Sequence, residues 1–279
     1  MKAASFDYVR PSGVEEACRL LAEFDGRAKV LAGGQSLGPM LNLRLVRPDV
    51  VVDVTALSEL KGVEDGRDNV LIGACVTTAN VEDGRVPDPA GGALADVARH
   101  IAYRAVRNRG TVGGSLVHAD PSADWVSCLA AFGATARVAG PNGRRQVPIE
   151  RFVTAPFEVD LGPGELLVAV RVPRLGPGAR FGFYKFCRRT GEFAEAIGVV
   201  LCDPARGVFR AAIGATESTP IVVADAASLF GGRRDGPLAP VFDAGAVAAR
   251  LTEAGIVDPY RRRVLSAALR RAASRADAS

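Results

Sequence analysis

The sequence predicts an α+β fold made of a small α/β unit, a larger mixed unit rich in antiparallel strands, and a C-terminal domain with a three-stranded antiparallel sheet and helices. Three observations lead to this fold class. Near the N-terminus, a segment with helical apolar spacing precedes two short strand-like runs. In the middle of the chain, strand-like runs flank turn sequences such as Pro141-Asn142-Gly143. Toward the C-terminus, three strand-like runs precede alanine-rich helical segments.

Length and composition predict a globular protein with two domains. The chain has 279 residues, of which 48% are hydrophobic and 24% are charged, so it can bury a substantial core. Prolines and glycines cluster between Pro173 and Gly178, as is typical of a linker. We therefore expect one domain over residues 1–175, with subdomains at about 1–55 and 56–175, and a second domain over residues 176–279.

The first unit is predicted from three local patterns. Ser12 and Glu15 have the spacing of a capping box, and apolar residues then recur at helical spacing until about Gly26. Residues 29–32 form a short apolar run, which predicts a buried strand. Residues 48–54 are rich in β-branched side chains and have the composition of a central strand.

Alternation, helical spacing and turn residues predict the remaining elements. In the first domain these are a strand pair within residues 63–73, a helix at 94–101, a helix starting near Ser122, a hairpin of 135–139 with 146–149, and a strand at 166–172. In the second domain they are strands at 181–186, 194–201 and 208–214, joined as an antiparallel meander, and helices at 224–230, 244–254 and 260–273.

Charge and cysteine usage exclude several classes of protein. The net charge of +4 arises from 35 basic and 31 acidic residues, which is too balanced to indicate a nucleic-acid binder. An acidic residue, Asp7, precedes any apolar run of signal-peptide length, and no run of about 18 apolar residues occurs, so we expect a cytoplasmic protein. With two histidines and no Cys-x-x-Cys pair, no metal site is expected. We expect all five cysteines to be buried, reduced thiols: Cys18, Cys75, Cys128, Cys187 and Cys202.

Basic residues are concentrated near the C-terminus. They could form an ordinary solvated helix face, which we favour, or a surface that docks a partner. The residues are Arg261, Arg262, Arg263, Arg270, Arg271 and Arg275.

Two glycine-rich segments give the strongest functional signal. Residues 32–36 follow a strand and precede a helix that Ser36 can cap, and residues 111–115 again combine a hydroxyl residue, a Gly-Gly pair and a serine. Free amide groups and the macrodipole at a helix start favour phosphate oxygens, and glycine lets the backbone approach a ligand closely. We therefore predict that both loops hold the diphosphate of one nucleotide cofactor. For either loop alone, a tight turn without a ligand is the alternative.

Asp124 lies in the first turn of the helix that is predicted to start near Ser122. A carboxylate at this position stabilises a helix by itself. It could equally accept hydrogen bonds from ribose hydroxyls or an adenine amine, and the sequence leaves both interpretations open.

These segments resemble the FAD-binding medium subunit of molybdenum hydroxylases, the family that contains aerobic carbon monoxide dehydrogenase and the flavin domain of xanthine dehydrogenase. Residues 42–45 (NLRL), 47–48 (RP), 107–110 (RNRG) and 119–121 (ADP) fit the family too, and the resemblance covers nearly the whole chain. It implies that residues 1–175 form an FAD-binding domain and that FAD lies between the N-terminal α/β unit and the neighbouring mixed unit.

The resemblance also implies a set of FAD-binding residues. Lys185 matches a lysine near the cofactor, and Phe193 stands where some relatives have a tyrosine beside the flavin ring. Gln35 stands where some relatives have histidine, and no cysteine-bearing insertion for an extra iron–sulfur cluster is visible. The full set is Ala32, Gly33, Gly34, Gln35, Ser36, Ile101, Thr111, Val112, Gly113, Gly114, Ser115, Asp124, Leu167, Lys185 and Phe193.

The function implied by the resemblance is electron transfer through FAD. A large molybdenum-cofactor subunit would oxidise the substrate, a small subunit with [2Fe–2S] clusters would deliver the electrons, and FAD would pass them to a quinone, NAD or oxygen. A membrane contact would arise only through a quinone acceptor, no nucleic-acid partner is expected, and no residue is expected to act as a catalytic acid, base or nucleophile. The alternatives are a self-sufficient FAD-dependent oxidoreductase and a non-redox nucleotide-binding module.

Overall fold

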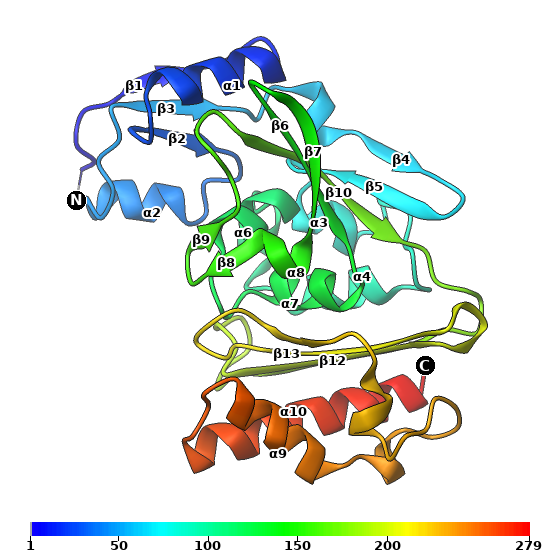
Figure 1. The fold of residues 1–279 in the computed structure, drawn as a ribbon. Coiled ribbons are helices and arrows are strands. Elements are labelled where there is room, and N and C mark those ends of the chain that lie inside the picture. Colours follow the sequence, from blue (N-terminus) through cyan, green and yellow to red (C-terminus); the bar gives the residue numbers. More distant parts are fainter. Residues whose placement is uncertain (1) are drawn as a thin grey trace.

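The computed structural model describes residues 2–279, which form three layers of sheet and helix stacked along the molecule (Figure 1). The N-terminal α/β unit lies at one end, a mixed unit lies in the middle, and an antiparallel sheet with its helices lies at the other end. This arrangement confirms the predicted fold class. No helix within residues 2–279 is long and apolar enough to cross a membrane.

The N-terminal unit is a three-stranded parallel sheet with strand order β1-β3-β2. The central strand β3 is fully buried, as its composition predicts. Its first three residues are valines, and the fourth, Asp53, is hydrogen-bonded. The elements are β1 (Asp7–Val9), α1 (Val14–Glu23), β2 (Ala28–Leu31), α2 (Leu37–Asn42) and β3 (Val50–Asp53).

The predicted capping box of Ser12 with Glu15 is wrong. Helix α1 begins at Val14 and has Gly13 as its N-cap, so the carboxylate in the third helical position is that of Glu16. The Glu16 carboxylate accepts hydrogen bonds from the Ser12 amide at 2.8 Å and from the Ser12 hydroxyl at 2.6 Å. The capping box is therefore absent, because Gly13 and not Ser12 occupies the cap and has no side chain to accept a hydrogen bond.

The middle unit is a five-stranded antiparallel sheet, with strand order β4-β5-β10-β6-β7, packed against short helices. The predicted strand pair, hairpin and later strand are all present in it. Its elements are η1 (Ser58–Lys61), β4 (Val63–Asp65), β5 (Asn69–Gly73), α3 (Thr78–Glu82), α4 (Ala93–Arg99), α5 (Arg104–Arg107), α6 (Val112–His118), α7 (Asp124–Ala131), β6 (Thr135–Gly140), β7 (Gly143–Pro148), α8 (Ile149–Phe152), β8 (Val153–Ala155), β9 (Glu158–Val159) and β10 (Leu166–Pro173).

The C-terminal sheet has four strands, so the prediction of three was one short. The missed strand is β14, which pairs with β13 and contains only three residues. The predicted helix at 224–230 is a 3-10 turn. The elements are β11 (Arg180–Phe186), β12 (Ala196–Asp203), η2 (Pro204–Arg206), β13 (Val208–Gly214), β14 (Ile221–Val223), η3 (Ala226–Leu229), η4 (Ala239–Val241), α9 (Ala244–Glu253) and α10 (Pro259–Asp277).

The C-terminal sheet is covered on both faces. Helix α10 lies against one face, and it approaches so closely that a Cβ on Gly198 would lie 2.4 Å from the backbone oxygen of Ala268. The other face packs on α7, and Phe183 and Ile197 belong to the same hydrophobic core as Trp125 of that helix. One core therefore runs across the boundary that the sequence predicts at residue 175, and the division into two domains stays a prediction.

A tight contact between α7 and β13 joins the middle unit to the C-terminal sheet. A Cβ on Gly214 would lie 1.9 Å from the hydroxyl oxygen of Ser127. Ser127 is fully buried, and its hydroxyl has no hydrogen-bond partner within residues 2–279. The glycine therefore provides the space that the serine side chain occupies.

Most of the arginines near the C-terminus bind within the chain. Arg275 donates to the Phe183 carbonyl at 2.6 Å, and Arg261 donates to the Glu195 carbonyl at 2.6 Å. Arg262 donates to the Ala248 carbonyl, and Arg271 lies over the ring of Tyr184. These side chains hold α10 to the sheet and to α9, so the structure supports a structural role for most of the cluster.

All five cysteines are free thiols in the structure. Four of them are buried, as expected, whereas Cys187 is only partly buried. Cys187 differs because it directly follows β11, where the chain leaves the core and enters a surface loop.

Candidate functional site

The first glycine segment is a turn between β2 and α2. Gly34 has a φ of 71°, a left-handed conformation that glycine adopts without steric cost. Within the described residues, the amide groups of residues 33–36 donate no hydrogen bond, and the Ser36 hydroxyl does not cap α2. A row of unused donors at the carboxyl end of a parallel strand is suited to an anionic ligand.

The structure brings the two glycine segments into direct contact. A Cβ on Gly33 would lie 2.1 Å from the backbone oxygen of Arg109, just before the second segment. A Cβ on Gly114 would lie 4.0 Å from the Cβ of Ala32. The predicted meeting of the two loops is therefore present, and Gly33 is the residue that permits it.

The second segment differs from the prediction because the amides of residues 112–115 are already paired. It is the first turn of α6, where the Thr111 hydroxyl caps the helix by accepting from the Gly114 amide at 3.0 Å. The amides of Val112 and Gly113 donate to Val76 and Ala74, and the Ser115 amide donates to Thr111. The Ser115 hydroxyl and the Thr111 amide donate no hydrogen bond within residues 2–279, so both are free donors of this loop.

An ion-pair cluster joins the elements that precede the second segment, and no pattern in the sequence indicated it. Arg107 donates to Glu82 at 2.7 Å and also to the carbonyls of Ile101 and Ala102. Arg104 pairs with Glu82 at 2.8 Å and with Asp83. The hydrogen bond from Arg107 is the main reason that the pKa of Glu82 is lowered. The pairs join α3 to α5 across more than twenty residues, a distance at which local spacing carries no signal.

Asp53 lies at the carboxyl end of β3, beside the end of β2, and sequence reasoning did not single it out. Its carboxylate accepts from the Thr55 amide at 2.8 Å, from Arg10 at 3.1 Å and from the Tyr8 hydroxyl. Burial raises the pKa of Asp53, but these hydrogen bonds outweigh burial and hold the pKa at about 2. Asp53 thus stabilises the edge of the sheet from which the first loop departs.

Asp124 and Lys185 form a buried ion pair between α7 and β11. Their oxygen and nitrogen atoms are 3.0 Å apart, and Lys185 also donates to the His100 carbonyl at 3.1 Å. Burial raises the pKa of Asp124, while the lysine partly opposes this shift. The second carboxylate oxygen, Oδ1, is buried and has no partner within residues 2–279. It can accept a hydrogen bond from a ligand hydroxyl or amine, so the interpretation of Asp124 as a binding residue fits this geometry.

The three remaining predicted residues have different surroundings. Ile101 is partly buried and packs on the main core, next to the ion-pair cluster. Leu167 is only 2% exposed and lies inside that core, so its side chain serves packing. Phe193 is 70% exposed on the loop between β11 and β12, which makes it available to a ligand.

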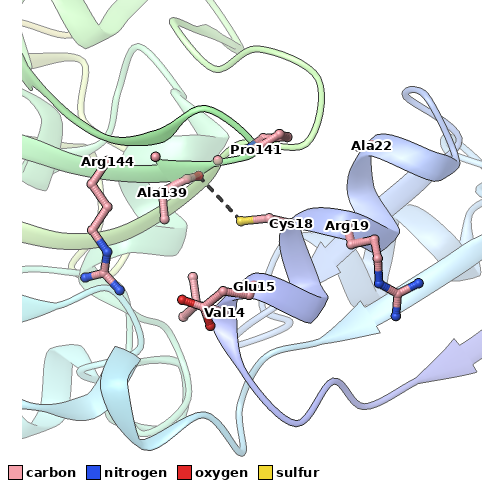
Figure 2. Close-up of a pocket in the computed structure, with 10 residues that line it drawn as sticks. Val14, Glu15, Cys18, Arg19, Ala22, Ala139, Pro141 and Arg144 are labelled. Carbon is pink, nitrogen blue, oxygen red and sulfur yellow. Dashed lines mark hydrogen bonds between the residues drawn. The ribbon is translucent and has the colours of Figure 1, made fainter.

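A cavity of about 440 Å³ lies elsewhere, between α1 and the β6–β7 hairpin (Figure 2). Its lining includes Glu15, Arg19 and Arg144, and the Cys18 thiol donates to the Ala139 carbonyl at 3.5 Å. Burial raises the pKa of the Cys18 thiol, which disfavours a reactive thiolate. We interpret the cavity as a packing junction between the N-terminal unit and the hairpin.

The described geometry fits a dinucleotide with a diphosphate. Residues 33–36 offer unused amides, Ser36 and Ser115 offer hydroxyls, and Asp124 offers an unpaired acceptor at a separate place. No pair of residues among these has the arrangement of a nucleophile and its base. The site is therefore suited to holding a cofactor whose own chemistry does the work.

Comparisons with known proteins agree with this interpretation. The chain is 38% identical to the alpha subunit of the 6-hydroxypseudooxynicotine dehydrogenase complex of Paenarthrobacter nicotinovorans over 76% of this chain and 73% of that protein. It is 31% identical to the carbon monoxide dehydrogenase medium chain of Afipia carboxidovorans, over 100% of this chain and 99% of the relative.

The solved structures give the same result. Carbon monoxide dehydrogenase from Hydrogenophaga pseudoflava superposes with a TM-score of 0.87 at 30% identity, over 100% of this chain and 99% of that chain. Quinoline 2-oxidoreductase from Pseudomonas putida superposes with a TM-score of 0.83 at 31% identity, over the same shares. Residues 4–175 match the family model described as the FAD binding domain in molybdopterin dehydrogenase. The chain therefore belongs to the family of FAD-binding subunits of molybdopterin dehydrogenases.

Proposed function

We propose that this chain is the FAD-carrying electron-transfer subunit of a molybdenum-containing hydroxylase or dehydrogenase complex. Electrons would arrive from [2Fe–2S] clusters and leave to an external acceptor. Family membership supports the cofactor, and the names of several relatives, such as nicotine 6-hydroxylase medium subunit, support a place in a larger complex. The observation that carries the proposal is the direct contact between the two glycine segments beside a row of unused amides.

The proposed roles follow from the free groups of the site. The amides of residues 33–36 and the hydroxyls of Ser36 and Ser115 would bind the diphosphate of FAD. Ala32, Thr111, Val112, Gly113 and Gly114 shape the two walls, with Thr111 fixing the start of α6.

The remaining roles concern the rest of the cofactor. Asp124 would accept a hydrogen bond through Oδ1, and Lys185 would hold the Asp124 carboxylate in place. Ile101 and Phe193 would exclude water from the flavin, and Leu167 would support this region from the core. When bound, FAD supplies the redox chemistry, which includes both one-electron and two-electron steps.

The partners and the cellular location are part of the proposal. A small [2Fe–2S] subunit would donate electrons, and a large molybdenum-cofactor subunit would oxidise the substrate. The free thiols of the structure support a cytoplasmic location, where disulfides are rare. A quinone, NAD or oxygen would accept the electrons.

Two measurements test the proposal. The purified chain, titrated with FAD, should bind it and show flavin absorption in the blue part of the spectrum. The chain alone should not oxidise substrates of its relatives, such as nicotine or carbon monoxide, and should be reduced only with its partner chains or an artificial electron donor. Turnover by the chain alone would show a self-sufficient oxidoreductase, and preference for a plain nucleotide over FAD would overturn the flavin assignment.

A further inference from the structure

The segment from Ile101 to Gly110 contacts both ends of the proposed flavin site. At one end, the backbone oxygen of Arg109 packs on Gly33 of the first glycine segment. At the other end, the ring of Tyr103 packs on Gly191, in the loop of residues 187–195 between β11 and β12. We call residues 187–195 the aromatic loop because Phe193 lies in it.

The contact between Tyr103 and Gly191 is close. A Cβ on Gly191 would lie 2.6 Å from two ring carbons of Tyr103, so no larger residue fits there without moving the ring. Gly191 also has a φ of 90°, a conformation that other residues rarely adopt. Tyr103 remains 59% exposed, so the contact does little to build the core. Its effect is to fix the tip of the aromatic loop.

The base of the aromatic loop is fixed separately. The Glu195 amide donates to the Phe186 carbonyl at 2.8 Å, and Arg188 pairs with Glu195 at 2.6 Å. Arg261 of α10 donates to the Glu195 carbonyl. Within the tip, the Glu192 amide donates to the Arg189 carbonyl at 3.1 Å and closes a turn around Gly191. These bonds shape the loop itself, and the Tyr103 ring is a contact that seats its tip, two residues before Phe193, against another segment.

The backbone of Tyr103 lies at the start of an anchored helix. It is the N-cap of α5, whose Arg104 and Arg107 pair with Glu82 and Asp83. Because its backbone is anchored in this way, the Tyr103 ring can restrict the loop without a further loss of backbone entropy.

We propose that Tyr103 is a positioning residue: its ring seats Gly191 and thereby holds Phe193 in place beside the flavin. The inference rests on the proposed function, which puts Phe193 at the flavin ring. It adds that the segment 101–110 connects the diphosphate end of the site to the ring end. A loop that is ordered before binding loses less conformational entropy when the cofactor arrives, so the seat should increase affinity for FAD.

The test compares four single variants of the full chain, and the double variant Tyr103→Ala with Gly191→Ala, in the presence of its partner chains. Tyr103→Ala removes the ring, Tyr103→Phe keeps it, and Gly191→Ala pushes it away. Tyr260→Ala is the control, because Tyr260 is similarly exposed, at 51%, on α10, next in the chain to Arg261, which contacts the base of the loop and not its tip. FAD affinity is measured by quenching of flavin fluorescence, and the environment of the bound ring by visible circular dichroism. Trypsin cleavage after Arg188 and Arg189, without FAD, reports the mobility of the aromatic loop.

Tyr103→Ala and Gly191→Ala should each weaken FAD binding by roughly threefold to tenfold, the size expected for one lost aromatic contact. Both should also change the dichroism of the bound flavin and speed trypsin cleavage of the loop. Tyr103→Phe and Tyr260→Ala should behave like the unmodified chain, and Gly191→Ala should add little to Tyr103→Ala because both disturb one contact.

The proposal is overturned if Tyr103→Ala leaves both affinity and cleavage unchanged, or if Tyr103→Phe is as impaired as Tyr103→Ala. Failure of the proposed function looks different. In that case the unmodified chain does not bind FAD at all, while the cleavage experiment still reports whether Tyr103 seats the loop.

Discussion

Gly33 provides the sharpest test of the site, because a single methyl group should separate its two walls. Gly33 does not have a left-handed φ, so alanine is compatible with its backbone and the effect is purely steric. The added Cβ would lie 2.1 Å from the backbone oxygen of Arg109, whereas ordinary contacts begin at 3.4 Å. To reach an ordinary contact the loops must therefore move apart by 1.3 Å, the difference between these distances.

A shift of this size takes at least one amide out of reach of a phosphate oxygen. A hydrogen bond to a charged group contributes about 1.5–3 kcal/mol, so Gly33→Ala should weaken FAD binding by roughly tenfold to 150-fold. The assay is a fluorescence titration with FAD, accompanied by far-ultraviolet circular dichroism to show that the chain remains folded.

Gly38 provides a matched control in the same segment. It lies in α2, and a Cβ there would meet nothing within 4 Å. Gly38→Ala should leave FAD affinity unchanged and favour the helix slightly. If Gly33→Ala binds FAD as tightly as Gly38→Ala, the close approach of the loops does not shape the site and the reasoning fails.

Three further predictions concern stability, each measured by denaturant unfolding. The pKa of Asp53 is about 2 in the folded chain against an ordinary 3.8, so its carboxylate stabilises the fold above about pH 4 by about 2 kcal/mol, and this is lost as pH falls through about 2. Asp53→Asn should flatten that part of the pH profile, and an unchanged profile would contradict the assignment. Lys185→Met should lower the free energy of unfolding by about 3–5 kcal/mol, because it leaves the Asp124 carboxylate buried without a partner. The double variant with Asp124→Leu should recover much of this loss, and equal losses in the single and double variants would count against a coupled pair. Ser127→Ala should leave the free energy of unfolding unchanged because the Ser127 hydroxyl is unpaired, whereas Gly214→Ala should lower it by about 1–3 kcal/mol by overpacking. A larger loss for Ser127→Ala than for Gly214→Ala would refute this description of the packing.

Much of the fold could be predicted because the local signals agree with the tertiary structure. The hairpin around Pro141-Asn142-Gly143 has both a turn sequence and flanking alternation, and its register follows from them. Strand β14 was missed because a three-residue edge strand has too few residues for a pattern. The predicted capping box was wrong because Ser12 and Gly13 both suit a helix start, and only the packed structure decides between them.

The candidate site, too, could be predicted from the sequence only in part. The two glycine segments are visible in the sequence because phosphate binding needs small residues at a helix start. Their unequal state is not visible, since the amides of the second segment pair with Ala74 and Val76, which lie far away in the sequence. The same holds for the pairing of Asp124 with Lys185, which brings together two side chains 61 positions apart. Motifs reveal which residues can bind a ligand, whereas burial and pairing decide which atoms are free to do so.

The two glycine segments differ in whether they need the cofactor to become ordered. Since α6 completes its first turn with donors and acceptors from its own polypeptide, that wall can form during folding without help from any small molecule. The turn between β2 and α2 has no such internal substitute for its amides, so its final order depends on what it captures. Loss of the cofactor should thus loosen the first glycine segment and leave the second one intact, so that rebinding requires only one short turn to become ordered again.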